Sequence, residues 1–346
     1  MTQDGPADGP TPDRGGPPLK VVAIGGGTGL STLLRGLRPY ATAPAPSSRL
    51  AVDITAIVTV TDDGGSSGRL RRDFDVLPPG DIRNCMVALS EDEALLSRLF
   101  QYRFPSGRGL KGHSFGNLFL AALSNVTGDF AQAVRVSSEV LAIGGRIYPS
   151  TASNVALEAT LEDGARVIGE TKISKSRARI ERIALRPRRS RPLKETLRAI
   201  AEADLITFGP GSLFTSVIPN LLVEGIPEAI RQSAAIKAYI VNLMWQPGET
   251  VNFAASDHVR AILTHSCDGL LDCVVVNTHP IGSALRRKYA RERAQPVEND
   301  LGRLKKLGLA IVAADLLEQK ETVRHDPDAL ARVVIDLAAA GRRRRR

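Results

Sequence analysis

Cysteine, histidine and aromatic residues are scarce in this chain of 346 residues. Its three cysteines, Cys85, Cys267 and Cys273, are odd in number and show no CxxC spacing, which argues against a disulfide framework. The five histidines show neither an HExxH motif nor paired metal-ligand spacing. Aromatic residues make up 4% of the chain, so stacking platforms for nucleic-acid bases would be few. Unpaired thiols fit a reducing compartment, and we expect a cytoplasmic protein.

Long apolar runs are also missing. No stretch approaches the ~20 apolar residues that a membrane-spanning helix needs. Residues 1–18 are rich in Pro, Gly and Asp and have no apolar centre, so they do not form a signal peptide. We expect them to be a disordered leader, and we expect no membrane span.

Positive charge is in excess, but its distribution argues against a nucleic-acid function. The formal net charge is +9, and five of these charges come from the arginines of residues 342–346. Residues 336–346 are therefore predicted to be a basic C-terminal tail, since such runs usually form solvated segments. No helix-turn-helix, zinc-finger or RNA-recognition signature is visible, so we expect no specific nucleic-acid partner.

What the chain does contain is a regular alternation of short apolar runs and glycine-bearing turns. Residues 19–24 (LKVVAI) and 53–60 (DITAIVTV) are predicted strands, and a leucine-rich helical pattern lies between them. Four later segments, DLITFGPGS, KAYIVNLM, LDCVVVN and LAIVAAD, also contain predicted strands. Such nearly continuous apolar strands are typical of a parallel sheet covered on both faces. We predict an α/β fold, a three-layer Rossmann-like domain with a mainly parallel sheet over residues 19–335.

Two segments interrupt this alternation. Residues 84–140 show apolar residues at helical spacing and are predicted to be a helical insertion. Residues 147–186 contain short alternating segments, and they are predicted to be a β-rich insertion with a hairpin that turns at Asp163-Gly164. We find no internal repeat, so a single domain with insertions is expected rather than two domains.

Glycine-rich loops follow several predicted strands, where open α/β sheets bind ligands. Residues 25–29 (GGGTG) precede a helix whose first N–H groups can bind a phosphate. They do not match the dinucleotide fingerprint GxGxxG, because the sixth residue is leucine, and no GKS or GKT follows as in a Walker loop. Residues 208–216 (FGPGSLFTS) are predicted to form a second anion cradle, with Ser212 and Thr215 as side-chain donors. Residues 242–250 (NLMWQPGET) add amide and acid groups after another strand.

Three other loops carry candidate chemistry. Asp62 and Asp63 follow the second predicted strand, where adjacent carboxylates are suited to hold a hydrated Mg²⁺ or the hydroxyls of a ribose. In PPGDIRN, Asp81 is expected to cap a helix. Arg83 would lie in the first turn of that helix, where its charge opposes the helix dipole unless an anion is bound. In KGHSFGN, His113 is a candidate acid or base.

Taken together, the segments GGGTGLSTLLRGL, TVTDDGGSSGRLR, PPGDIRN, GHSFGNLFL, FGPGSLFTSVIPNLL and NLMWQPGET resemble the gluconeogenesis factor family. That family is more distantly similar to the 2-phospho-L-lactate transferases. The resemblance covers residues 19–335 and implies a Rossmann-like fold that binds a nucleotide sugar of the UDP type. It also implies a role in cell shape and envelope growth on gluconeogenic carbon sources. The ligand contacts that it implies are Gly26, Gly27, Thr28, Gly29, Asp62, Asp63, Asn117, Gly211, Ser212, Tyr289 and Arg324.

The resemblance also assigns roles within this set. Tyr289 would stack on a base, and Arg324 would pair with a diphosphate. The chain departs from the transferase branch at DDGGSSGRLRRDFDV, where that branch has an acidic pair followed by a longer tryptophan-containing stretch. Trp245 stands where a smaller residue is usual in the family. The first difference favours the gluconeogenesis-factor branch.

Three functions are compatible with these residues. The leading hypothesis is a nucleotide-sugar-binding regulator that acts on envelope-synthesis protein partners, with homo-oligomerisation left open. The alternative is a Mg²⁺-dependent transferase of a phospholactyl-type group from a nucleotide donor. Its catalytic candidates are Asp62, Asp63 and His113, with Asp62 as the Mg²⁺ ligand. A dehydrogenase is disfavoured because the dinucleotide fingerprint is absent.

Overall fold

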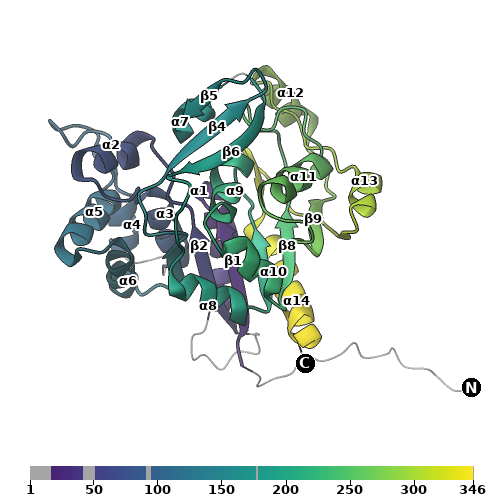
Figure 1. The fold of residues 1–346 in the computed structure, drawn as a ribbon, viewed down its shortest axis with the longest axis horizontal. Helices are drawn as coiled ribbons and strands as arrows, with labels where there is room; N and C mark the ends of the chain where they lie inside the picture. The colour runs from purple at the N-terminus through teal and green to yellow at the C-terminus, as the bar shows by residue number, and fades with distance from the viewer. Residues whose placement is uncertain (1–16, 42–50, 91–94, 177, 346) are drawn as a thin grey trace, which may run out of the picture.

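A computed structural model describes residues 17–41, 51–90, 95–176 and 178–345. Its centre is a sheet of seven strands in the order β10-β9-β8-β7-β1-β2-β3 (Figure 1). Every neighbouring pair of these strands runs parallel, which confirms the predicted α/β fold class. The strands are β1 (Leu19–Gly25), β2 (Val52–Val58), β3 (Arg146–Pro149), β7 (Leu205–Phe208), β8 (Ile236–Ile240), β9 (Cys273–Asn277) and β10 (Ala310–Ala314).

The central strands are apolar on both faces because both faces are covered. β1 and β7 pair from Val21 with Leu205 to Ile24 with Phe208, and all four of these side chains are fully buried. Burying one such side chain stabilises the fold by about 1.5–3 kcal/mol. The loops that leave β1 and β7 therefore start from fully buried strands.

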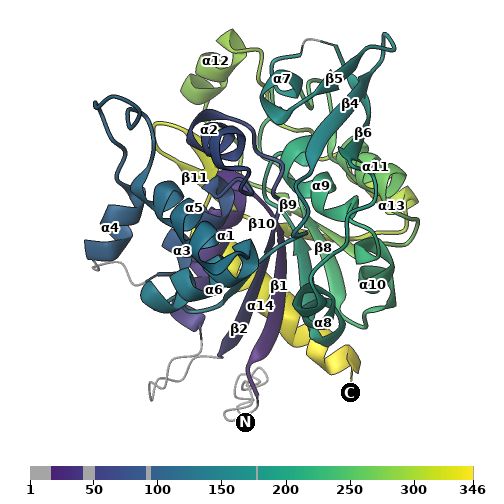
Figure 2. The same ribbon diagram turned by 60° about the vertical axis from the view of Figure 1, so that its left-hand side comes forward.

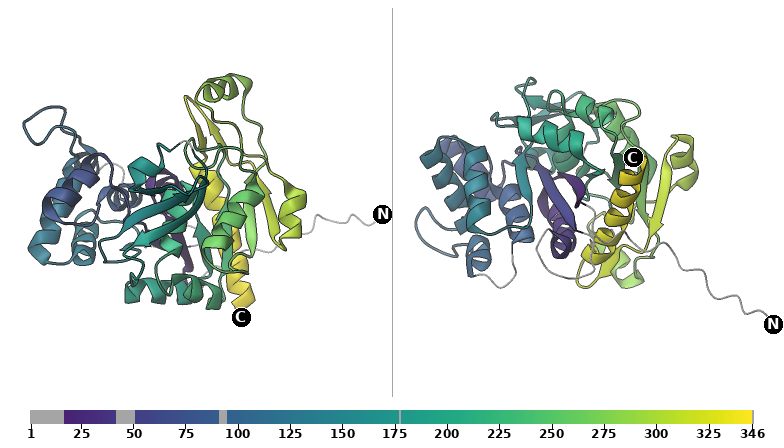
Figure 3. Two further views of the ribbon diagram at one scale, coloured as in Figure 1. Left: turned by 45° about the horizontal axis from the view of Figure 1, so that its top comes forward. Right: turned by 90° about the horizontal axis from the view of Figure 1, so that it is seen from below.

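Helices cover the two faces of the sheet and complete the three layers (Figures 2 and 3). On one face, α1 (Gly27–Leu37) packs against α3 (Gly80–Leu89) and α14 (Pro327–Arg345), and α14 lies along β1, β7 and β8. The crossovers β1 to β2 and β7 to β8 run in opposite directions across the sheet, and right-handed crossovers then place their helices on opposite faces. The second face carries α8 (Lys194–Glu202), α9 (Ile218–Leu221), α10 (Ile226–Gln232), α11 (Ala255–His265) and α13 (Leu301–Lys306).

Residues 84–140 are mostly helical. Two of their helices begin at side-chain caps: Ser114 accepts the N–H of Asn117, and Asp129 accepts the N–H groups of Ala131 and Gln132. Such caps satisfy backbone donors that have no partner inside a helix. The helices of this segment are α3, α4 (Leu95–Gln101), α5 (Phe115–Thr127) and α6 (Phe130–Val140), and α2 (Gly65–Phe74) precedes them in the chain.

The segment 147–186 divides between two sheets. β4 (Ala156–Leu161), β5 (Arg166–Ile168) and β6 (Ile180–Arg186) form a separate antiparallel sheet in the order β5-β4-β6. The β4–β5 hairpin turns at Gly164, whose φ is +81°. β3 instead pairs in parallel with β2 and forms one edge of the main sheet. The local alternation cannot show this, because the partner strand lies some 90 residues away in sequence.

The basic C-terminal residues continue α14 up to Arg345, and Arg346 lies outside the described residues, as do residues 1–16 of the expected leader. Arg342 and Arg345 both contact the carboxylate of Asp204, whose side chain is 5% exposed. A buried carboxylate is costly without a counter-charge. At least part of the arginine run therefore neutralises a buried acid beside β7 and is not a solvated tail.

Within the described parts of the chain, no single helix is both long and apolar enough to span a membrane. The helices Leu213–Leu221 and Ile226–Gln232 reach the required length and composition only as a pair, and a bend of 76° separates them.

Candidate functional site

The order in which successive strands are added to the main sheet reverses between β1 and β7. From β1 the chain continues to β2 and β3 on one side, and from β7 it continues to β8, β9 and β10 on the other. Open α/β sheets bind ligands at such a switch point, beyond the carboxyl ends of the strands. The two glycine-rich loops, residues 25–29 and 209–212, leave β1 and β7 at this place.

The loop after β1 turns directly into α1. Gly26 is the N-cap of α1, and Gly27 has a φ of +61°, a conformation that glycine adopts with little strain. At Gly29 a Cβ atom would lie 2.3 Å from the carbonyl oxygen of Pro210, so the two glycine-rich loops are in direct contact. The first turn of α1, with its N–H groups and the positive end of the helix dipole, borders the crevice.

A groove of about 340 Å³ lies over these loops. Its walls come from the loops after β1, β7 and β8 and from a hairpin formed by β11 (Leu317–Gln319) and β12 (Val323–His325). Ser212 Oγ accepts a hydrogen bond of 2.7 Å from Gln246 Nε2, which ties two of the walls together. The sequence-predicted ligand residues that line the groove are Gly26, Gly27, Thr28, Gly29, Gly211, Ser212 and Arg324.

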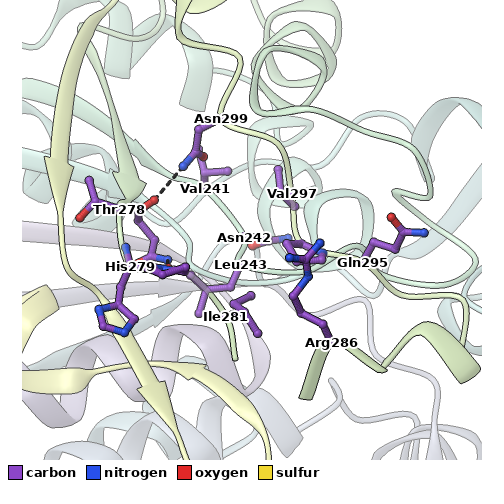
Figure 4. A pocket seen from close by; sticks show the side chains of 13 residues that line it. Val241, Asn242, Leu243, Thr278, His279, Ile281, Arg286, Gln295, Val297 and Asn299 are labelled. Carbon is purple, nitrogen blue, oxygen red and sulfur yellow. Dashed lines mark hydrogen bonds between the residues drawn. The ribbon is translucent and has the colours of Figure 1, made fainter. Parts of the chain in front are cut away.

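A second pocket, also of about 340 Å³, continues the groove, because Asn242 and Leu243 line both (Figure 4). It lies at the carboxyl ends of β8 and β9. The amides of Gln295 and Asn299 contribute to its lining, and Asn299 Nδ2 donates to the carbonyl oxygen of Asn277 at 2.7 Å. We call the groove and this pocket together the ligand groove.

Three partly buried carboxyl groups gather behind the glycine loop, and we call them the acidic cluster: Asp62, Asp81 and Glu170. Burial, with the nearby charge of Asp62, raises the pKa of Asp81 to about 7. Burial raises the pKa of Glu170 to about 9, and the charges of Asp62 and Asp81 add to this shift. Burial also raises the pKa of Asp62. The cluster therefore holds protons at neutral pH that isolated carboxyl groups would release.

Asp81 differs from its expected role as a helix cap. It lies inside the first turn of α3, whose N-cap is Pro79 and has no side-chain cap bond. Its carboxylate accepts the backbone N–H of Gly27. The helix-cap prediction is wrong because the short side chain finds a donor on the neighbouring loop of the sheet.

Asp62 and Asp63 are adjacent in sequence but have separate partners. Asp62 Oδ1 accepts the N–H of Gly64 at 2.8 Å. Asp63 Oδ1 accepts the N–H and the hydroxyl of Thr171, at 2.9 Å and 2.7 Å, and so fixes the start of α7 (Glu170–Ile173). Neither residue is among those that line the ligand groove. Asp62 belongs to the acidic cluster, whereas Asp63 holds the β-rich insertion in place beside it.

His113 and Asn117 lie behind the acidic cluster and do not line the ligand groove. His113 is buried, and its Nδ1 lies 2.9 Å from Ser66 Oγ. Burial lowers the pKa of His113, which favours a neutral imidazole at neutral pH. Asn117 Nδ2 donates to Ser67 Oγ at 3.4 Å, and its Oδ1 is buried without a partner among the described residues.

Tyr289 is on α12 (Ser283–Arg291), a helix with no buried residue, and it is not among the residues that line the ligand groove. Its hydroxyl accepts the N–H of Val323 at 3.1 Å, immediately before Arg324. The structure thus shows Tyr289 supporting the strand that carries Arg324.

Sequence reasoning missed Glu170 altogether. This residue lies in the β-rich insertion, more than 100 positions from Asp62, and no local motif marks it. It joins the acidic cluster because Asp63 binds the first turn of α7. Asn299, which the sequence reasoning also missed, follows a loop without glycine and reaches the ligand groove only through its bond to β9.

The residues present can be tested against the expected Mg²⁺ ion. In the described parts of the chain, no group of three or more His, Cys, Asp or Glu side chains has the arrangement of a metal site. Mg²⁺ in nucleotide sites is usually held by one or two carboxylates together with phosphate oxygens and water. Asp62 and Asp81 therefore fit such an ion only in combination with a bound phosphate.

Residues 21–317 match the family model described as 2-phospho-L-lactate transferase CofD. The matched span includes both glycine-rich loops and the whole acidic cluster. The chain belongs to this family, in the branch of the gluconeogenesis factors, as the resemblance of its motifs predicted.

Relatives of that name support the assignment. The gluconeogenesis factor of Halalkalibacterium halodurans is 49% identical over 317 residues, which span 91% of this chain and 95% of that protein. The gluconeogenesis factor of Bacillus subtilis is 48% identical over 319 residues, or 92% of this chain and 98% of that protein. A crystal structure of a Bacillus halodurans protein has a TM-score of 0.87 and 48% identity, and covers 92% of this chain and 100% of its own. The same fold is thus present in a solved relative.

Proposed function

We propose that this protein binds a nucleotide sugar of the UDP type in the ligand groove and acts as a regulator of cell shape and envelope growth on gluconeogenic carbon sources. The binding proposal rests on one observation above all. Two glycine-rich loops and Arg324, which are far apart in the sequence, line one groove at the switch point of the sheet. The regulatory part draws on relatives that are named gluconeogenesis factors.

The chemistry of the ligand groove changes along its length. At the glycine loops, the first turn of α1 and the guanidinium of Arg324 suit a diphosphate, because both attract negative charge. At the ends of β8 and β9, the amides of Asn242 and Asn299 suit the polar edge of a base. A nucleotide diphosphate carries these two groups in this order. Its sugar would then occupy the remaining space near Ser212.

The acidic cluster adds a proton-linked element to this proposal. The carboxyl group of Asp81 accepts the N–H of Gly27, so it lies beside the proposed diphosphate site. A bound diphosphate would raise the pKa of Asp81 further above 7, because it adds negative charge nearby. Ligand binding near neutral pH is therefore expected to take up protons.

A transferase of a phospholactyl-type group from a nucleotide donor is the second candidate. The match to the family described as 2-phospho-L-lactate transferase favours it. Asp62 and Asp81 next to the glycine loop would hold a Mg²⁺ ion together with ligand phosphates, and the ion would stabilise negative charge that develops on the phosphate. Protonated Glu170 could give a proton to a leaving oxygen.

The deciding experiment is a calorimetric titration of the full chain with UDP-N-acetylglucosamine, with and without Mg²⁺, followed by mass spectrometry of the recovered ligand. A regulator binds without metal and returns the ligand intact. A transferase needs Mg²⁺, consumes the nucleotide in the presence of an acceptor, and loses activity in Asp62→Asn. If no binding is seen under either condition while a folded protein is verified, the nucleotide-sugar proposal is wrong.

A further inference from the structure

The two edges of the main sheet are built differently. One edge is β3, which begins with Arg146, ends with Pro149 and packs against α6. Arg146 also forms an ion pair with Asp53 on the neighbouring strand. Charge, proline and a packed helix are features that keep an edge strand from pairing with another chain. The β3 edge is therefore protected.

The opposite edge, β10, has none of these features in its own sequence. Its residues are AIVAA, without charge, proline or glycine. Ala310 and Ala313 are exposed, and Ile311 and Val312 are half-buried. The elements that pack closely against β10 are β9 and α13. Every other edge strand of the described sheets carries charge: Arg146 on β3, Arg166 on β5, Glu181 and Arg182 on β6, Glu318 on β11 and Arg324 on β12.

The backbone of β10 also presents hydrogen-bonding groups on its outer side. The N–H of Ala310 donates at 3.1 Å to the residue just before β9, and the carbonyl oxygen of Ala314 accepts, at 2.9 Å, the N–H just after β9. Because successive residues of a strand direct these groups to opposite sides, those of Ile311 and Ala313 point away from β9. No hydrogen bond to another described residue engages them. The outer side of β10 can therefore accept one more strand.

We infer that β10 is an interface between two copies of this chain, which pair antiparallel through this strand about a twofold axis at Val312. Ile311 of one copy then lies opposite Ala313 of the second copy, and the two residues exchange N–H···O bonds. The twofold axis repeats this pair, so the outward groups of both strands are satisfied. Such an isologous contact closes at a dimer, because it uses the free side of both β10 strands. The dimer does not require the proposed ligand.

The charges on either side of β10 favour this antiparallel arrangement. The helix before the strand, α13, carries three exposed cations: Arg303, Lys305 and Lys306. After the strand come Asp315 and Glu318, whose ion pairs within the chain are with His279 and Lys320. Antiparallel pairing places the cationic end of one copy beside the acidic end of the other, whereas parallel pairing would bring like charges together. A second copy of this chain is therefore a complementary partner for the β10 edge.

In this dimer the two ligand grooves face in opposite directions. Each groove lies at the carboxyl ends of the strands of one copy, and the strands of the second copy run the other way across the twofold axis. The grooves would then open at opposite edges of one continuous sheet. Each groove is lined by residues of a single copy.

The test is the molecular mass of the full chain in solution, measured by sedimentation velocity over a wide range of protein concentration. We expect a concentration-dependent equilibrium between monomer and dimer in the wild type. A chain that stays monomeric at every concentration overturns the inference. So does a chain that grows beyond a dimer, because the twofold contact leaves no free side of β10.

Two substitutions at Ala313 locate the interface. Ala313→Pro removes an outward N–H and leaves the hydrogen bonds to β9 in place, a position at which edge strands tolerate proline. Ala313→Lys keeps the N–H and adds a charge of the kind that protects other edges. We expect each to raise the dissociation constant of the dimer by about tenfold or more. Ala313→Ser, which keeps both the N–H and a small side chain, is the control and should change it by less than about twofold.

Thermal denaturation verifies that each of these variants is folded. If Ala313→Pro does not fold, Ala313→Lys decides the outcome. A dimer that persists unweakened in the folded variants forms through another surface, and this result overturns the inference.

Charge reversal tests the antiparallel orientation. The double variant K305E/K306E should weaken the dimer by about threefold or more, and adding Asp315→Lys should restore it, because attraction across the interface then returns. The control is K172E/K175E, which makes the same change in net charge at two exposed lysines in the β-rich insertion. The antiparallel pairing is wrong if K305E/K306E leaves the dimer unchanged, if Asp315→Lys weakens it further, or if the control weakens it equally.

Discussion

The glycine loops and the acidic cluster lie side by side at one edge of the same sheet, and they are built in opposite ways. The glycine loops present backbone N–H groups beside the guanidinium of Arg324 on β12, and the two loops are in close contact. The acidic cluster presents carboxyl groups whose pKa values are raised by burial and by one another's charge. The first region is the proposed anion site. The other responds to pH and to the charge of what is bound next to it.

This difference teaches why adjacent motifs can have different roles. Asp62 and Asp63 follow a strand of the sheet as closely as the glycine loops do, yet they do not line the ligand groove. A glycine loop acts through its backbone, whose position the strand determines. A carboxylate acts through a side chain that turns toward its nearest donor, and for Asp63 that donor is Thr171 in the β-rich insertion.

The largest effect is expected where the two glycine loops touch. In Gly29→Ala, the new Cβ would lie 2.3 Å from the Pro210 oxygen, so one loop must move. We expect a loss of about 2–4 kcal/mol in the free energy of unfolding, measured by urea denaturation. Gly27→Ala is the matched control: its Cβ would meet only Ser216 Oγ, at 3.8 Å, and its φ is positive, so it should lose about 1 kcal/mol. Equal stabilities of the two variants would contradict the loop contact.

Gly27→Val tests the same loop for binding. The branched side chain would stand over the first turn of α1, where the proposed diphosphate lies. We expect binding of UDP-N-acetylglucosamine to be abolished in calorimetry while the variant remains folded. Unchanged affinity in the folded variant would refute this placement of the phosphates.

A pH-dependent effect is expected from the acidic cluster. Asp81 and Glu170 have pKa values of about 7 and about 9 when folded, above those of the unfolded chain, so the folded state holds more protons between pH 4 and 9. The free energy of unfolding should therefore fall as pH rises through this window. The double variant D81N/E170Q should remove most of this fall between pH 5 and pH 9, on the order of several kcal/mol.

Denaturation curves across this pH range test the prediction. The control is Glu181→Gln, an exposed carboxyl group on β6. Its pH profile should follow the wild type. If the double variant D81N/E170Q loses as much stability at high pH as the wild type, these carboxyl groups do not cause the fall in the free energy of unfolding.

A smaller effect is expected at the guanidinium of the ligand groove. Arg324→Gln removes a proposed diphosphate contact and should weaken binding of UDP-N-acetylglucosamine by about tenfold, or about 1.4 kcal/mol. Lys320→Gln is the control, since it removes an exposed charge from the same hairpin. If both variants weaken binding equally, the effect is general electrostatic attraction and not a contact.

The smallest effect is expected from Tyr289→Phe. This change removes only the acceptor for the N–H of Val323, and it should weaken ligand binding by about threefold, or roughly 0.5–1 kcal/mol. In the background of Arg324→Gln, it should have almost no further effect if Tyr289 acts by positioning Arg324. A full additional loss would instead mean that the Tyr289 hydroxyl contributes to binding independently of Arg324.

Much of the fold and part of the site could be predicted from local patterns. Each of the six predicted strands of the main sheet is present, because apolar runs bounded by glycine turns report burial on both faces. The groove residues 26–29 could be predicted for a similar reason, because glycines before a helix indicate a positive φ or a close approach of the backbone. β3 was assigned to the wrong sheet, because pairing with β2 depends on a distant strand.

The amino-acid sequence by itself determined the class of fold, the two glycine loops and the family. These depend on backbone conformation and on burial, and both restrict which residue types occur at neighbouring positions in the sequence. Only the tertiary structure decided which carboxyl groups raise one another's pKa, and that Glu170 is one of them. These features depend on distances between side chains far apart in the chain, and Coulomb energy follows such distances rather than separation in sequence.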